Sequence, residues 1–282
     1  MNTRTRPLQV MVIAAHPDEP EEYAGGLAAA YAEAGHHVKF LTLTNGSAGH
    51  ASLDAPSLVA RRAREAHCAA ERLGVVEYEI FDDVDDGSLV PTLELRMRVI
   101  RSVRRWRADV VIAFHPEGGG HPDNRAAGRI AADALHFTEL RNVLPAVPPL
   151  PRAPLFLLMP DYATVDRHRH EIAIDLAPVL ERKLLGCDAH GSQFYEFSAT
   201  GDDRPVPPAD DWAGRRAYLL DHWKPWFESS EGMRKALTER YGAEHAAQVT
   251  YAESFQLAPG RRGYTQEELA DLLPPVPVPA AG

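Results

Sequence analysis

The sequence predicts an α/β protein whose central sheet is mostly parallel, with helices on both of its faces. Two observations support this prediction. Over the first two-thirds of the chain, short apolar runs alternate with segments in which apolar residues have helical spacing, and two of the apolar runs end directly before a polar cluster that begins with histidine. Strands separated by helices pair in parallel, because each helical crossover returns the chain to the same end of the sheet.

The predicted strands are apolar runs of strand length that end in polar or turn residues. They span residues 8–15, 38–46, 76–83, 109–116 and 154–161, with a late strand within residues 248–257. Folds of this type bind ligands at the carboxyl ends of the parallel strands. The polar segments that follow the first and fourth of these strands should therefore meet at one edge of the sheet, although they are far apart in the sequence.

Helices are predicted between the strands, where apolar residues recur with helical spacing. They span residues 23–37, 56–74, 91–108 and 124–137, and a further helix covers about residues 177–187. Gly74 ends the second helix and Pro91 lies near the start of the third, as these residues often do at helix boundaries. A polar, Pro-rich loop at residues 199–211 precedes a Trp-rich helical segment at residues 212–242.

One domain is predicted for residues 1–282, and no internal repeat is present. Its core spans about residues 8–200, a C-terminal helical extension covers about residues 208–257, and a Pro-rich, disordered tail covers residues 273–282.

Composition narrows the functional classes. The 282 residues are 45% hydrophobic and carry a formal net charge of −10, which disfavours nucleic acid as a partner because phosphate binding needs a basic surface. The two cysteines argue against a disulfide framework and against a cysteine-based zinc site. The apolar run before His16 is too short for a signal peptide or a membrane span. We therefore expect a cytoplasmic protein without a membrane partner; a homo-oligomer is compatible with the sequence.

The first polar cluster is His16-Pro17-Asp18-Glu19. On a tight loop, residues at positions i and i+3 can turn toward one point, and an imidazole with a carboxylate is a normal zinc donor pair. Asp18 would then face another direction, where it could accept a proton from a metal-bound water. The alternative is structural: Asp18 caps the following helix, and Glu19 lies in its first turn near the positive helix end.

Two glycines in that helix favour a site over a simple cap. Gly25 and Gly26 each cost about 1 kcal/mol of helix stability. Close packing, or a close approach of the backbone to a site, would explain both of them.

The second polar cluster, His121-Pro122-Asp123-Asn124, follows three glycines and repeats the His-Pro-Asp order. The carboxylate of Asp123 could pair with His121, fix its tautomer and raise its basicity. Such a pair beside a metal-bound water suits general-acid work on a leaving amine. A helix N-cap at Asp123 or Asn124 is the structural alternative, and both interpretations can hold together.

Other candidates are weaker. His190 and Gln193 follow a helix, but a single loop histidine is more often a surface or core residue. Three tryptophans could offer stacking faces to a ligand, although packing in a core or an oligomer is their commoner use: Trp212, Trp223 and Trp226.

On these motifs, the chain resembles the LmbE-like, or PIG-L, N-deacetylases. The family's first motif, Ala-His-Pro-Asp-Asp followed by Gly-Gly, appears here as residues 15–19 with Gly25-Gly26, and its second motif, His-Pro-Asp-His, as residues 121–124. Intervening and later segments, such as residues 41–50 and 249–257, are also similar, so the resemblance covers nearly the whole chain. It implies a Rossmann-like, LmbE-like α/β fold.

The resemblance also implies a metal-dependent enzyme with one Zn²⁺ or another divalent cation. His16 would be a metal ligand and Asp18 the general base. His121, backed by Asp123, would stabilise the oxyanion or protonate the leaving amine.

The other two implied metal ligands, Glu19 and Asn124, depart from the family pattern. Glu19 stands where Asp is expected, and Asn124 stands where His is expected, although a neutral amide is a poor donor to Zn²⁺ beside an imidazole. Glu19 could reach across, with Asn124 or a water completing the site; the site could prefer a harder or more weakly held metal; or the chain could have lost its metal. His115 and His50 are candidates to replace the missing ligand, with a surface or supporting role the better expectation for His115.

The leading functional hypothesis is a metal-dependent hydrolase that removes an acyl group, such as acetyl, from an N-acylated small molecule such as an amino sugar or its conjugate. The alternative is a non-hydrolytic binding or regulatory protein with a degenerate metal site, and Asn124 is the feature that separates the two. A nucleotide-binding protein is disfavoured, because the first strand is not followed by a Gly-x-Gly-x-x-Gly turn.

Overall fold

The computed structural model describes residues 6–117, 120–164, 167–197, 205–259 and 263–275. Seven strands form one sheet in the order β3-β2-β1-β4-β5-β7-β6. The strands are β1 (Gln9–Ala14), β2 (His37–Thr42), β3 (Glu77–Ile80), β4 (Val110–Phe114), β5 (Leu155–Met159), β6 (Ile172–Asp175) and β7 (Ala252–Leu257). The first five pair in parallel, and β7 runs antiparallel to both β5 and β6. The predicted α/β fold with a mostly parallel sheet is therefore confirmed.

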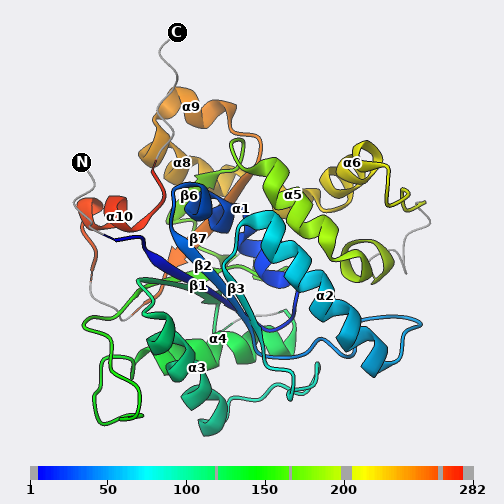
Figure 1. The fold of residues 1–282 in the computed structure, drawn as a ribbon. Helices are drawn as coiled ribbons and strands as arrows, with labels where there is room; N and C mark the ends of the chain where they lie inside the picture. The colour runs from blue at the N-terminus through cyan, green and yellow to red at the C-terminus, as the bar shows by residue number, and fades with distance from the viewer. Residues whose placement is uncertain (1–5, 118–119, 165–166, 198–204, 260–262, 276–282) are drawn as a thin grey trace.

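Helices cover both faces of the sheet (Figure 1). The five that follow the strands in the first part of the chain are α1 (Glu19–Glu33), α2 (Ala55–Leu73), α3 (Leu93–Trp106), α4 (Pro122–Leu135) and α5 (Leu180–Ala189). Helices α1, α2 and α5 pack on one face and α3 and α4 on the other. Side chains of β1 alternate between these two cores: Val10 and Val12 belong to the first, Met11 and Ile13 to the second.

The C-terminal part of the chain adds shorter helices. They are α6 (Trp212–His222), α7 (Lys224–Phe227), α8 (Arg234–Tyr241), α9 (Ala243–Gln248) and α10 (Gln266–Leu272). Of these, α7 contacts β7, α8 contacts β6 and α6 contacts α5. A small separate core joins α8 and α9 to these strands, with Leu237 and Val249 among its buried residues. Within the described ranges, none of the helices combines the length and the apolar composition that crossing a membrane requires.

Several boundaries differ from the sequence prediction. The strand β6 and the helix α10 were not expected, whereas α9 lies within the predicted helical extension. The helix α1 begins at Glu19 rather than residue 23, and the helix at about residues 177–187 is α5, which begins at Leu180. The late strand is confirmed as β7. The tail predicted at residues 273–282 begins with Leu273, which is buried, and its residues 276–282 lie outside the described residues, as do residues 198–204 around the Pro-rich loop. The division into core and extension stays a prediction.

A buried ion pair ties α1 to the C-terminal part of the fold. Lys183 of α5 pairs with Glu253 of β7, and both side chains are almost fully buried. The Lys183 ammonium also donates to the backbone oxygen of Glu22, while the Glu253 carboxylate accepts hydrogen bonds from the backbone N–H groups of Gly26 and Leu27. The pair thus fixes the helix whose first turn carries the first polar motif.

Candidate active site and metal centre

The two His-Pro-Asp motifs meet at the carboxyl edge of the sheet, as the strand pattern predicts. The first follows β1 and the second begins α4, a few residues after β4, and β1 and β4 are neighbours in the sheet. The ring centroids of His16 and His121 lie 4.9 Å apart. Together the motifs form one end of a pocket of about 480 Å³, to which five of their residues contribute: His16, Asp18, Glu19, His121 and Asn124.

Glu19 folds back onto His16. One of its carboxylate oxygens accepts hydrogen bonds from the backbone N–H groups of Ala15 and His16, at 2.9 and 2.8 Å, and the other lies 3.0 Å from the Nδ1 atom of His16. The two side chains therefore converge, as their spacing predicts. The carboxylate is engaged with the backbone of its own loop, so its main visible effect is to orient the imidazole, with Nε2 toward the pocket residues.

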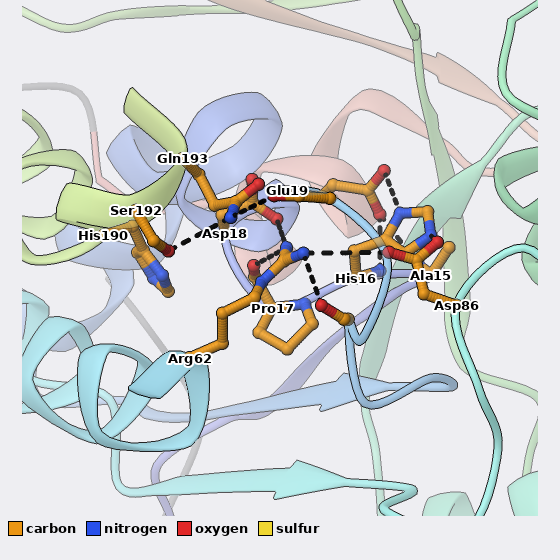
Figure 2. Close-up of polar contacts among 12 residues, drawn as sticks. Ala15, His16, Pro17, Asp18, Glu19, Arg62, Asp86, His190, Ser192 and Gln193 are labelled. Carbon is orange, nitrogen blue, oxygen red and sulfur yellow. Dashed lines mark hydrogen bonds and ion pairs between the residues drawn. The ribbon is translucent and has the colours of Figure 1, made fainter. Parts of the chain in front are cut away.

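Two further carboxylates surround the Nε2 atom of His16: Asp86 at 3.0 Å and Asp123 at 3.4 Å (Figure 2 shows His16 with Glu19 and Asp86). Burial acts to lower the pKa of His16, but the three carboxylates outweigh it and raise that pKa well above its ordinary value. Burial likewise acts to raise the pKa of Asp86, yet the hydrogen bond with His16 and the neighbouring Arg62 hold it below its usual value. This corner of the pocket thus concentrates negative charge around one imidazole.

Asp18 occupies the N-cap position of α1, but its side chain makes no capping hydrogen bond. The structural alternative is therefore confirmed for the positions of Asp18 and Glu19 at the start of the helix, but it is wrong about a capping side chain. Its backbone has a φ of 122°, which is unusual for a residue other than glycine, and such strain is common at functional sites. Burial raises the pKa of the Asp18 carboxyl to about 6, against the opposing effect of the Arg62 guanidinium.

Arg62 of α2, which the sequence analysis did not single out, holds Asp18 in place. Its guanidinium donates to Asp18 Oδ1 at 2.8 Å and to the carbonyl oxygens of Pro17 and Gly46 (Figure 2). A Cβ at Gly46 would lie 2.7 Å from that guanidinium, and the φ of Gly46 is 68°, so this turn requires glycine. Asp86 was missed as well, although the acidic segment that contains it follows the third predicted strand at the same sheet edge.

The second motif is arranged differently from the prediction. His121, rather than Asp123 or Asn124, is the N-cap of α4, and its Nδ1 accepts a hydrogen bond from the backbone N–H of Asp123. The Asp123 carboxylate accepts hydrogen bonds from the backbone N–H groups of Gly87 and Leu89. Among the described residues, it makes no hydrogen bond with the side chain of His121. The tautomer of His121 is thus set by the helix backbone and not by the carboxylate.

The side chains of His16, His121 and Asp123 could hold a metal ion, because one ligand atom from each lies within 4.8 Å of the others. Asn124 lines the same pocket as His16 and His121, and its side-chain oxygen is buried with no hydrogen-bond partner among the residues described. An unpaired amide oxygen in a buried position is costly, and a cation would satisfy it. The donor set therefore fits a divalent cation, whereas the Glu19 carboxylate is engaged by Nδ1 of His16 and by two backbone N–H groups.

The remaining candidates lie elsewhere. His190 is fully buried, with Nε2 3.1 Å from a carboxylate oxygen of Glu21. His115 accepts a hydrogen bond from the backbone of Glu117, and His50 pairs with a glutamate at the surface, so neither lines the pocket or replaces a metal ligand in the described structure. By contrast, Gln193 does line the pocket, as do two of the three tryptophans in the extension.

Fold and site together define an α/β enzyme with a metal-suited pocket at the sheet edge. Residues 11–135 match the family described as PIG-L: GlcNAc-PI de-N-acetylase. The chain is 29% identical over 197 residues, 67% of its length and 71% of the relative's, to the diacetylchitobiose deacetylase of Thermococcus kodakarensis. It is 32% identical to a 1D-myo-inositol 2-acetamido-2-deoxy-alpha-D-glucopyranoside deacetylase of Kineococcus radiotolerans, over 42% of each chain.

Solved structures with deacetylase names have a similar fold. The N,N'-diacetylchitobiose deacetylase of Pyrococcus horikoshii superposes with a TM-score of 0.66 at 25% identity, covering 89% of this chain and 84% of that one. A 4-carboxy-2-hydroxymuconate hydratase from Pseudomonas putida has the same TM-score of 0.66 at 18% identity over 91% of this chain and 98% of that chain, which shows the fold alone. The likeness to the PIG-L, LmbE-like N-deacetylases that the motifs predict is therefore confirmed. The sequence relatives carry deacetylase names, which favours the hydrolase over the binding-protein alternative.

Proposed function

We propose that the chain is a metal-dependent N-deacetylase that removes an acetyl or related acyl group from an amino sugar or its conjugate. One observation carries this proposal: ligand atoms of His16, His121 and Asp123 converge at the end of a pocket that Asp18 also lines. The relatives named as deacetylases support amide hydrolysis as the reaction, and the small pocket suits a small-molecule substrate.

The cation would be held by His16, His121 and Asp123, with the orphaned amide oxygen of Asn124 as a further donor. A mixed nitrogen and oxygen set suits Zn²⁺ and several other divalent transition metals, and we propose Zn²⁺. When bound, such a cation polarises the amide carbonyl and lowers the pKa of water. Glu19, an implied ligand, is assigned instead to orienting His16, because its carboxylate is already engaged by two backbone N–H groups.

The chain's own residues would move the proton. Asp18 lines the pocket and is held by Arg62, so its carboxylate can take the proton of the attacking water and pass it to the amine nitrogen. A C–O bond forms as the C–N bond breaks, and the products are a carboxylate and a free amine. The strained backbone of Asp18 keeps this carboxylate at the pocket instead of at the helix cap.

Metal analysis tests the ligand assignment without relying on turnover. Elemental analysis of the purified protein should find near-stoichiometric divalent metal, which His16→Ala and Asp123→Asn lose. The variant Glu19→Gln should retain most of it, because an orienting residue is less essential than a ligand. Complete loss in Glu19→Gln would instead make Glu19 a ligand.

Acetate release tests the reaction. The metal-loaded protein should release acetate from N-acetylglucosamine or N,N'-diacetylchitobiose, and Asp18→Asn should lower kcat by roughly 10²–10⁴-fold while keeping the metal. If the metal-loaded wild type released no acetate from any N-acetylated amino sugar, the non-hydrolytic alternative would become the better account.

A further inference from the structure

Much of the pocket lining is aromatic, which the metal chemistry does not require. Five aromatic side chains line it beyond the motifs: Tyr23, Tyr162, Phe197, Trp223 and Trp226. Four of the five lie outside residues 11–135, the segment that matches the family. Tyr162 is 54% exposed and Phe197 48% exposed, which is high for large apolar side chains. The part of the chain beyond the family match thus supplies most of the aromatic lining of the pocket, which the catalytic motifs do not provide.

The tryptophans are held in place before any ligand binds. The indole N–H of Trp223 donates to the backbone oxygen of Phe194 at 3.3 Å, and its ring centroid lies 4.7 Å from that of Phe194. Trp226 packs edge-on against Trp223 at 5.8 Å. Rings that are already ordered lose little conformational entropy when a ligand stacks on them, so they favour binding.

The charges of the pocket disfavour an anionic substrate group. Among the described residues that line the pocket, Arg62 is the single lysine or arginine. Its guanidinium is already engaged by Asp18 and by two backbone oxygens. The carboxyl groups that line the same pocket outnumber it: Asp18, Glu19, Glu22 and Asp86. A phosphate or carboxylate on the substrate would find no unengaged lysine or arginine there, and it would meet like charge at Asp86, whose pKa is held below its usual value.

We propose that the aromatic wall formed by Tyr162, Trp223 and Trp226 is a subsite for an uncharged apolar group attached to the N-acylated amino sugar. The inference rests on the proposed function for the chemistry of the amide, but the subsite itself is a statement about binding. The apolar group is either the aglycone of the sugar or a long acyl chain, and both would stack or pack on the same rings.

Binding separates the subsite from the reaction. Phenyl and methyl glycosides of glucosamine have no amide left to hydrolyse, so their dissociation constants can be measured by calorimetry on the intact protein. We expect the phenyl glycoside to bind roughly tenfold more tightly, since aromatic stacking and the buried apolar area both favour it. Trp226→Ala should abolish that preference, and Trp226→Phe, which keeps a ring, should restore part of it.

Trp212 supplies a matched control. It lies on α6 and packs against the same hydrophobic core but does not line the pocket, so Trp212→Ala should leave the preference unchanged. The acyl-chain source is tested by comparing kcat/KM for N-octanoyl- and N-acetylglucosamine: a preference for the octanoyl compound that Trp226→Ala removes places the acyl chain on the wall.

The outcomes are distinct. Equal binding of the two glycosides together with no preference for the octanoyl compound would overturn the subsite, as would a preference that survives in Trp226→Ala. A phenyl preference that depends on Trp226, in a protein that releases no acetate from any amide, would refute the proposed function and leave the subsite standing.

Discussion

Gly25 and Gly26 are neighbours in α1, yet their replacement by alanine should have opposite effects on stability. A Cβ at Gly25 would lie 3.7 Å from the side chain of Lys183 and 3.9 Å from that of Leu73, which are ordinary van der Waals contacts. Alanine is about 1 kcal/mol better than glycine inside a helix. Gly25→Ala should therefore raise the free energy of unfolding by about 0.5–1 kcal/mol.

At Gly26 the space is occupied. A Cβ there would lie 2.2 Å from Leu176 Cδ2 and 3.0 Å from a carboxylate oxygen of Glu253. Leu176 is fully buried, and the Glu253 carboxylate is held by the backbone N–H of Gly26 and by Lys183, so neither neighbour moves without loss. Overpacking costs about 1–3 kcal/mol and a disturbed buried hydrogen bond about 1–3 kcal/mol more, against a helix gain of about 1 kcal/mol. Gly26→Ala should lower the free energy of unfolding by about 1–5 kcal/mol.

Urea unfolding followed by circular dichroism measures both changes, provided that the m-value stays constant. Equal stability of Gly26→Ala and Gly25→Ala would refute this prediction, because the close approach of Leu176 and Glu253 would then have no energetic effect. Loss of stability in both variants would show that the helix as a whole, and not the second glycine, is closely packed.

Two other predictions concern buried charged groups. Lys183→Met should lower the free energy of unfolding by about 3–5 kcal/mol, because it leaves Glu253 buried without its partner. In urea titrations, adding Glu253→Gln should recover a large part of that loss. A loss below about 1 kcal/mol in Lys183→Met alone would contradict this prediction. Burial lowers the pKa of His168 to about 3, whereas a histidine in the unfolded chain titrates near 6.5. The neutral buried imidazole therefore contributes fully to the free energy of unfolding above about pH 6.5. That contribution declines as the pH falls toward 3, by about 2 kcal/mol at pH 5. His168→Phe should remove that part of the pH dependence, and an unchanged slope in the variant would count against it.

The sequence predicts the edge of the sheet well because its signals are local. The strands β1 and β4 are continuous apolar runs, and the polar residues that follow them are adjacent in sequence, so the meeting of His16 and His121 needs only the rule for parallel strands. The strand β6 was missed because it combines a length of only four residues with antiparallel pairing to β7, whereas β3 is as short but pairs in parallel and β7 is longer. Antiparallel pairing depends on tertiary contacts, so the periodicity of the local sequence does not predict it.

Site residues that depend on tertiary contacts were predicted less well. Asp86 comes from the loop after β3 and reaches His16 across the sheet edge; the same edge rule applied to the third strand would have identified it. Arg62 lies within an ordinary amphipathic helix, and only its contacts with Asp18 and Gly46 distinguish it from a solvated arginine. The extra methylene of Glu19 allows either a cation or the backbone as its partner, and the structure shows the backbone.

The two departures from the family motifs, Glu19 and Asn124, should be energetically coupled. Glu19 is long enough to reach back to the N–H groups of Ala15 and His16, which removes its carboxylate from the metal corner, while Asn124 contributes only an amide oxygen there. Glu19→Asp alone would lose the backbone contacts, and Asn124→His alone would add an imidazole donor to the existing set. Together they would recreate the family's pattern of ligands at these two positions.

A double-mutant cycle on metal affinity, measured by competition with a chelator, tests this coupling. Because residues that share a bound ion are rarely additive, we expect an interaction free energy of about 0.5–3 kcal/mol, with the double variant binding metal more tightly than the sum of the single changes predicts. Additive effects would refute this coupling. Glu19 would then act only through the orientation of His16, and the donor at position 124 would bind the cation independently of the side chain at position 19.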